Sequence, residues 1–211
     1  MIPLQELVFF ILAALVLVIS PGPNMIYLIS KSITQGKKSG LISLAGVVCG
    51  FLFHIIMVSF GLTAVLLAVP LAYTVLKTLG TVYLLYLAYQ AINPKSRNIF
   101  DVDKNSPHDG PKKLFTVGFL TNVLNPKVAV FYLSFFPQFI KPEYGSVLTQ
   151  SLELGVIQIF VSFSVNFIIV LTAARVAAFF AGNPFWVKVQ KWFMASVLTY
   201  LAVKMAFSKA R

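Results

Sequence analysis

Charge is scarce in this chain, and negative charge most of all. Six Asp and Glu residues stand against 17 Lys and Arg, and all charged residues together make up only 11% of 211. Soluble domains carry about 25%. Hydrophobic residues reach 58% and the mean hydropathy is +0.86. The chain lacks the polar surface that would cover a water-soluble globule, so the sequence predicts an integral membrane protein.

Other absences exclude several kinds of catalytic and binding site. Cys49 is the only cysteine, which excludes an intramolecular disulfide. The chain has neither a P-loop nor a Gly-x-Ser-x-Gly elbow, so neither ATP-driven pumping nor serine hydrolysis has support. Its two histidines, His54 and His108, have no metal partner at ligand spacing. We therefore expect no enzyme, no metal site and no cofactor.

The net charge of +11 could suggest nucleic acid as a partner. A basic run interleaved with aromatic residues on a polar face would be needed, and none is present. Positive charge in a membrane protein more simply marks cytoplasmic loops that face anionic lipid. We therefore expect lipid, and no nucleic acid, to contact this surface.

Long apolar segments dominate the sequence. Strand alternation is absent, and each segment is long enough to cross about 30 Å of hydrocarbon as a helix. We predict an all-α polytopic membrane protein, one membrane domain over 1–211 with six transmembrane helices. The predicted spans cover residues 7–29, 40–68, 71–92, 114–139, 147–180 and 189–207.

The two halves of the chain resemble each other. Residues 75–88 match 189–202 at one Val, one Lys and one Leu and at the triplet Tyr-Leu-Ala. Three spans per half is an odd number, so a duplicated half must insert upside down. We predict two inverted three-helix repeats, 1–92 and 114–211, joined by a cytoplasmic loop at 93–113.

Basic residues near the span ends predict the orientation. Most of them follow the first, third and fifth spans: Lys31, Lys37, Lys38, Lys95, Arg97, Lys104, Lys112, Lys113, Lys188 and Lys191. The positive-inside rule then places both termini outside. The basic C-terminus, with Lys209 and Arg211, argues the other way.

The first span contains a break, Ser20-Pro21-Gly22-Pro23-Asn24. Pro21 and Pro23 cannot donate to the carbonyls four residues earlier, so two acceptors are left free inside the membrane. The half-helix that starts near Asn24 offers free N–H groups. A kink that only serves packing is the plain alternative, but a matching break in the other half favours a binding site.

That second break is Asn125-Pro126-Lys127, in the fourth span. Pro126 frees the carbonyl of Asn122, and Lys127 places a charge where it costs at least about 2.5–3.5 kcal/mol. No acidic residue lies deep in any span, so a substrate carboxylate is a reasonable partner for Lys127. A purely structural role, with Lys127 paired to another residue, is the alternative.

Two further polar residues lie inside spans. His54 could relay protons near neutral pH, or it could be a hydrogen-bonded structural histidine. Asn166 in the fifth span could line the pathway or bond between helices. Gly46 and Gly50 form a small-xxx-small surface that lets helices approach closely.

These motifs resemble the LysE/RhtB superfamily of bacterial amino-acid exporters. The resemblance is carried by the Pro-Gly-Pro and Asn-Pro-Lys breaks, by Gly46…Gly50…His54 and by Phe136-Pro137-Gln138-Phe139. It implies a six-helix inner-membrane exporter of small amino acids or derivatives, driven by the proton gradient. Many members place an aspartate in the fifth span, where this chain offers Asn166 at most. That difference leaves His54 as the better candidate for a titrating group.

The residues and the resemblance together predict a secondary exporter of small, neutral amino acids in the bacterial cytoplasmic membrane. Pro21, Gly22, Pro23, Asn24, Asn125, Pro126 and Lys127 would bind a zwitterion, and His54 and Asn166 would serve proton coupling or the pathway. An exporter of a cation or another small metabolite is the alternative, which Lys127 and the lack of acidic ligands oppose. A homodimer is a candidate assembly.

Overall fold

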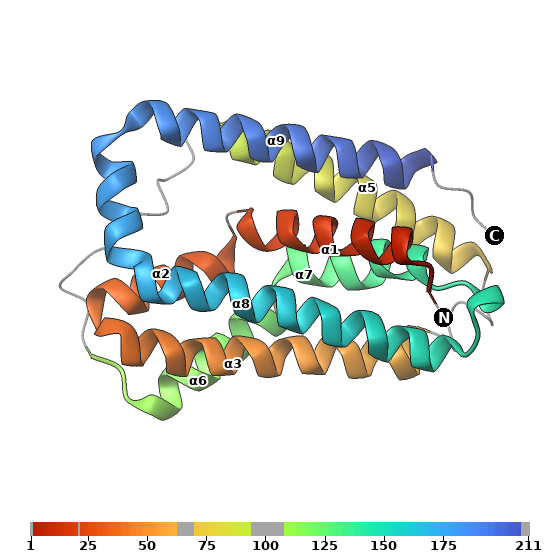
Figure 1. Ribbon diagram of the computed structural model, residues 1–211, viewed down its shortest axis with the longest axis horizontal. Coiled ribbons are helices and arrows are strands. Elements are labelled where there is room, and N and C mark those ends of the chain that lie inside the picture. The colour runs from red at the N-terminus through yellow and green to blue at the C-terminus, as the bar shows by residue number, and fades with distance from the viewer. Residues whose placement is uncertain (1, 21, 63–69, 94–107, 208–211) are drawn as a thin grey trace.

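The computed structural model describes residues 2–20, 22–62, 70–93 and 108–207, and every regular element in these ranges is helical (Figure 1). The order is α1 (Leu4–Ile19), α2 (Pro23–Thr34), α3 (Gly36–Met57), η1 (Val58–Leu62), α5 (Pro70–Ile92), α6 (Pro111–Val123), α7 (Pro126–Val130), η2 (Phe131–Phe135), η3 (Phe136–Phe139), η4 (Pro142–Tyr144), α8 (Val147–Gly182) and α9 (Pro184–Phe207).

Four of the predicted spans have the length and apolar composition of a membrane crossing. Two are continuous, α3 running into η1 and the long α8. Two are bent pairs, α1 with α2 at 54° and α6 with the helical segment from α7 to η3 at 45°. Breaks in the first and fourth spans are therefore confirmed. α5 and α9 are less apolar, so six crossings and the inverted repeat stay predictions.

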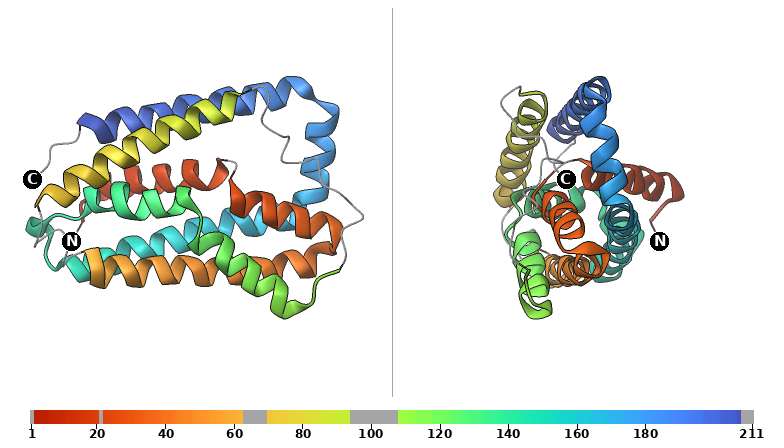
Figure 2. Two further views of the ribbon diagram at one scale, coloured as in Figure 1. Left: turned by 180° about the vertical axis from the view of Figure 1, so that it is seen from behind. Right: turned by 90° about the vertical axis from the view of Figure 1, so that its left-hand side faces the viewer.

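One half of each broken span, α1 or α7, lies at the centre of the molecule. α1 and α7 run side by side, with the α5–α9 pair on one side and α3, α6 and α8 on the other (Figures 1 and 2). The start of α1 and the end of α9 lie at the same end of the molecule (Figure 1). Which side of a membrane this end faces stays a prediction.

Several helix boundaries differ from the sequence prediction. The segment 93–113 was expected to be all loop, yet α6 begins at Pro111, which suits the first turn of a helix because it needs no N–H donor there. α2 continues to Thr34, and after the single residue Gln35 α3 starts at Gly36, whose φ of +82° is easy only for glycine. Residues 94–107 lie outside the described ranges.

Glycines set the tight packing of α3 against α6. A β-carbon on Gly46 would lie 2.1 Å from the Phe115 carbonyl oxygen, and one on Gly118 would lie 2.3 Å from the Ser43 carbonyl oxygen. Both neighbours are backbone, which cannot move aside as a side-chain tip can. The small-residue surface predicted at Gly46 is confirmed, and the paired glycine on α6 completes it.

Ion pairs join the two broken spans at both of their ends. At one end the Asp109 carboxylate accepts from Lys31 and from Lys113, each at 2.6 Å, and these bonds lower the pKa of Asp109 to about 2. At the other end Lys141 donates to Glu6 at 2.9 Å, which raises the pKa of Lys141. The start of each broken span is thereby tied to the end of the other.

Candidate substrate site at the two helix breaks

Lys127 links the two breaks directly. Its ammonium donates to the carbonyl oxygen of Leu17 at 2.9 Å and to that of Ser20 at 2.6 Å. Both oxygens belong to the end of α1, where the helix stops and its last carbonyls lose their intrahelical donors. The side chain is only 7% exposed. The two breaks, separated by about a hundred residues of sequence, therefore form one site.

Local sequence explains how each half of the site is built. Gly22 is extended, with φ −168° and ψ 177°, and Pro23 then opens α2. A β-carbon on Gly22 would lie 2.9 Å from the Lys127 Nζ, so the glycine leaves the room that the ammonium occupies. Pro21 lies outside the described residues. The prediction of a carbonyl left free at Leu17 is confirmed by its bond to Lys127.

The second break is closed by an asparagine cap. Asn125 precedes Pro126, the first residue of α7, and its Oδ1 accepts from the Lys127 backbone N–H at 3.0 Å. This bond leaves the Asn125 Nδ2 as a donor, and within the described structure it is buried without a hydrogen-bond partner. The Oδ1 of Asn24, in the first turn of α2, is likewise a buried acceptor without a partner there.

The site thus offers charges and dipoles of both signs. Lys127 and the Asn125 amide donate, whereas the Leu17 and Ser20 carbonyls and the Asn24 oxygen accept. Buried polar atoms without partners are rare in folded proteins because each costs about 1–3 kcal/mol. Their concentration at the two breaks is what a polar ligand site requires.

His54 lies beside the second break. Its Nε2 is 3.3 Å from the carbonyl oxygen of Asn122, the group that Pro126 leaves without its helical donor. A carbonyl only accepts, so this contact places the proton on Nε2. The His54 ring stacks on Tyr132, with centroids 5.3 Å apart and planes within 7°. Its position makes it both a structural partner of the break and a candidate for titration.

Asn166 is placed differently from the other predicted residues. Its Nδ2 donates to the Ser162 carbonyl in its own helix at 2.8 Å, and Gln158 donates to the Ser162 hydroxyl at 3.0 Å. These three side chains form a buried polar stripe along α8, the helix that packs on α1 and α2. Among the described residues, no hydrogen bond joins Asn166 to either break.

Sequence reasoning missed three buried polar residues: Asn122 and Tyr132, which lie beside the second break, and Gln158, which belongs to the stripe on α8. A signal was available for Gln158, which shares one helix face with Asn166 at i, i+4 spacing through Ser162. Asn122 lies only three residues before Asn125 in the sequence, close to the proline break. Tyr132 gave no such signal, because its neighbour His54 comes from a distant helix.

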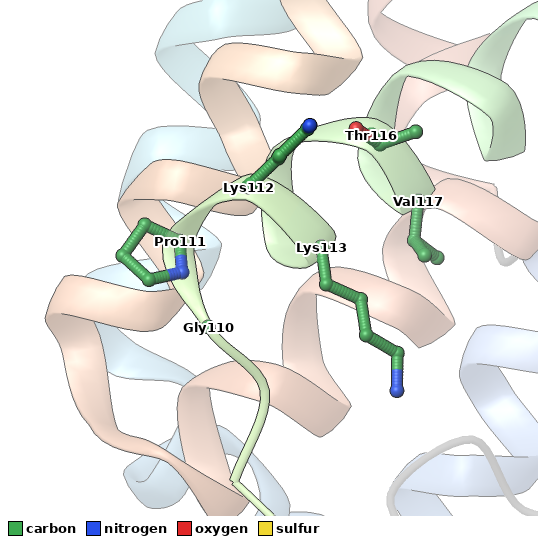
Figure 3. A pocket seen from close by; sticks show the side chains of 6 residues that line it. All are labelled: Gly110, Pro111, Lys112, Lys113, Thr116 and Val117. Carbon is green, nitrogen blue, oxygen red and sulfur yellow. The ribbon is translucent and has the colours of Figure 1, made fainter.

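A shallow hollow at the start of α6 stands apart from these groups (Figure 3). It is lined by Gly110, Pro111, Lys112, Lys113, Thr116 and Val117, all from one end of one helix. No residue of either break lines it. Within the described residues, no cluster of three His, Cys, Asp or Glu side chains is placed to hold a metal ion.

The sequence profile of the LysE type translocator family matches residues 15–209. The chain belongs to the LysE translocator family. It is 32% identical over 82% of its length to the homoserine/homoserine lactone efflux protein of Salmonella typhimurium, of which it covers 82%. An uncharacterized membrane protein of Pseudomonas aeruginosa is 29% identical, with 81% of each chain covered. No solved structure matches the chain.

Membership confirms the family resemblance that the broken spans suggested, and it makes this chain a multi-pass membrane translocator. The match to the LysE translocator profile begins at residue 15 and so includes both breaks, His54 and Asn166.

Proposed function

We propose that this LysE translocator exports small, uncharged amino acids or their derivatives from the cytoplasm by alternating access around the two helix breaks. The single observation that carries the proposal is the bond from the Lys127 ammonium to the Leu17 and Ser20 carbonyls. It makes the two broken spans one site, and broken spans that meet in this way are how many secondary transporters hold small charged metabolites. The names of the Salmonella relatives support the substrate class.

The groups at the site match a zwitterion. The carboxylate would bind the Lys127 ammonium and the Nδ2 of Asn125, which has no other partner among the described residues. The substrate ammonium would bind the Leu17 and Ser20 carbonyls and the Oδ1 of Asn24. Each ligand charge thereby meets its opposite in a region of low dielectric, where such contacts are strong.

Lys127 occupies the place that we propose for the substrate ammonium. Its Nζ already fills the acceptors at the end of α1. Binding would therefore be an exchange: the incoming ammonium displaces Lys127 from the carbonyls, and Lys127 turns to the incoming carboxylate. The exchange keeps every buried charge paired, because neither cation leaves its acceptor before the other arrives.

Proton coupling, gating and membrane location complete the proposed function. His54 would carry the coupled proton, since it touches the second break and titrates near neutral pH when unperturbed. The ion pairs at Asp109 and Lys141 would open in turn as the site faces one side and then the other. We place the protein in the bacterial cytoplasmic membrane with both termini outside, and a homodimer is a candidate assembly.

Counterflow in proteoliposomes tests the function. Vesicles are loaded with one amino acid from a panel, and uptake of the labelled compound is followed. We expect exchange of small uncharged amino acids by the wild type and none by Lys127→Ala. Lys112→Ala, which removes an exposed lysine, is the matched control and should transport normally. A monodisperse elution profile in detergent shows that each variant is folded. Normal exchange by folded Lys127→Ala would refute the proposal.

A further inference from the structure

A second group of buried polar atoms lies beside the zwitterion site. Asn122 and Tyr132 are both fully buried, at 0% exposure. Both side-chain atoms of the Asn122 amide and the hydroxyl of Tyr132 lack a hydrogen-bond partner within the described structure. The zwitterion site as proposed uses none of these three atoms. Because unpaired buried polar groups are destabilising, they call for a ligand of their own.

These atoms belong to one continuous assembly with His54. The Asn122 carbonyl holds the His54 Nε2, and the His54 ring stacks on Tyr132. Gly50, one turn before His54 on α3, allows the Asn122 side chain to approach closely: a β-carbon there would lie 2.6 Å from the Asn122 Cβ. Three elements, α3, α6 and η2, thus fix the positions of the unpaired atoms.

The assembly is joined to the zwitterion site through one short turn. The Asn125 backbone N–H donates to the Asn122 carbonyl at 3.0 Å, and the Asn125 side chain caps the Lys127 N–H. A substrate whose carboxylate meets Asn125 and Lys127 would lie within reach of this turn. Asn122 precedes the second break in the sequence, and Lys127 follows it.

The chemistry of the atoms defines what they can bind. An amide presents one acceptor and two donors, and a phenol both donates and accepts. Neither carries charge, and no acidic side chain is recorded against either residue in the described structure. A hydroxyl or a similar uncharged polar group would satisfy them, whereas an alkyl side chain would leave them unpaired and a cationic one would have no counter-ion.

We infer that Asn122 and Tyr132, which both contact His54, form the subsite that binds the substrate side chain and selects small amino acids with an uncharged hydrogen-bonding group. The inference rests on the proposed function and names its substrate class. A site built to hydrogen-bond a substrate hydroxyl discriminates strongly against the analogue that lacks it, because its own polar groups are then buried unpaired.

Counterflow with matched substrates tests this inference. Homoserine ends in a hydroxymethyl group where 2-aminobutyrate ends in a methyl group, and the two are otherwise identical. Lysine supplies a cationic side chain. The wild type should exchange homoserine at least about tenfold faster than either of the others. Equal exchange of homoserine and 2-aminobutyrate by the wild type would overturn the inference while leaving the proposed function standing. Exchange of no amino acid at all would overturn both.

Two variants assign the selectivity to residues. Asn122→Leu keeps the backbone carbonyl that holds His54 and removes the amide, and Tyr132→Phe removes one oxygen atom and keeps the stacked ring. Each should lower the homoserine preference severalfold. Tyr200→Phe, an exposed tyrosine, is the control and should leave the preference intact. The inference would be overturned if Tyr132→Phe and a folded Asn122→Leu both kept the wild-type preference for homoserine. If Asn122→Leu does not fold, the preference of Tyr132→Phe alone decides.

Discussion

Gly22→Ala is the sharpest perturbation of the site, because it moves the Lys127 ammonium without removing it. The new β-carbon would lie 2.9 Å from the Lys127 Nζ and 3.0 Å from its Cε. The backbone at Gly22 is extended, a conformation that alanine adopts without strain. The substitution therefore acts on the lysine tip and not on the fold of the chain.

The size of the effect follows from the contact distances. Carbon and nitrogen atoms rest about 3.5 Å apart, so the ammonium must retreat by about half an ångström. Such a move takes the 2.9 Å bond to Leu17 past the usual limit of about 3.2 Å. A hydrogen bond from a charged donor contributes about 1.5–3 kcal/mol. We expect the free energy of unfolding to fall by about 1–2 kcal/mol and exchange to fall about tenfold.

The assay combines counterflow with thermal unfolding in detergent. A loss of about 1–2 kcal/mol corresponds to a melting temperature lower by about 2–8 °C in a chain of this size. Gly61→Ala is the matched control, since a β-carbon at Gly61 would meet nothing within 4 Å. The decisive comparison is Gly22→Ala in a Lys127→Ala background, where the clash no longer exists and the substitution should cost nothing.

Two results would refute this reasoning. Exchange by Gly22→Ala that matches Gly61→Ala would mean that the position of the ammonium is not critical. An equal loss of melting temperature in the wild-type and Lys127→Ala backgrounds would mean that Gly22 acts through some group other than Lys127.

Three further predictions concern other parts of the molecule. His54→Gln should flatten the pH dependence of exchange measured in proteoliposomes, and an unchanged profile would exclude His54 from proton coupling. Asp109→Asn should lower the melting temperature at neutral pH. Because the pKa of Asp109 is about 2 when folded and about 3.8 when free, its stabilisation is complete above pH 4 and is lost as the pH falls through 2, so the difference between variant and wild type should vanish there. Gly46→Ala should destabilise by at least about 2 kcal/mol in thermal unfolding, since its β-carbon meets backbone, whereas Gly182→Ala, with open space around it, should not; equal effects would exclude close α3–α6 packing as the cause.

The breaks could be located from sequence because their causes are local. Proline lacks an N–H, so Pro126 had to interrupt its helix and free the Asn122 carbonyl whatever the rest of the chain did. Asn125 as the cap of the following helix is equally local. The extra helical turn at Pro111 was missed because the segment around it is hydrophilic, and the end of a helix outside the membrane carries no apolar pattern.

The partners of the freed groups could not be found in the same way. The sequence allowed Lys127 to meet a substrate or another residue, and both were physically reasonable. In the structure Lys127 bonds to the α1 carbonyls, which are available because α1 ends beside the second break. The stack of His54 on Tyr132 and the unpaired amide of Asn122 likewise depend on α3 lying against α6 and η2.

By itself the sequence determined the membrane environment, the helical class and the positions of both breaks. Each of these follows from composition or from the covalent chemistry of a single residue. Only the tertiary structure decided that the breaks coincide, that Lys127 is satisfied by backbone oxygens, and which polar atoms remain without partners. These are properties of groups brought together from opposite halves of the chain, and hydrogen bonding over 2.6–2.9 Å depends on a proximity that no local pattern encodes.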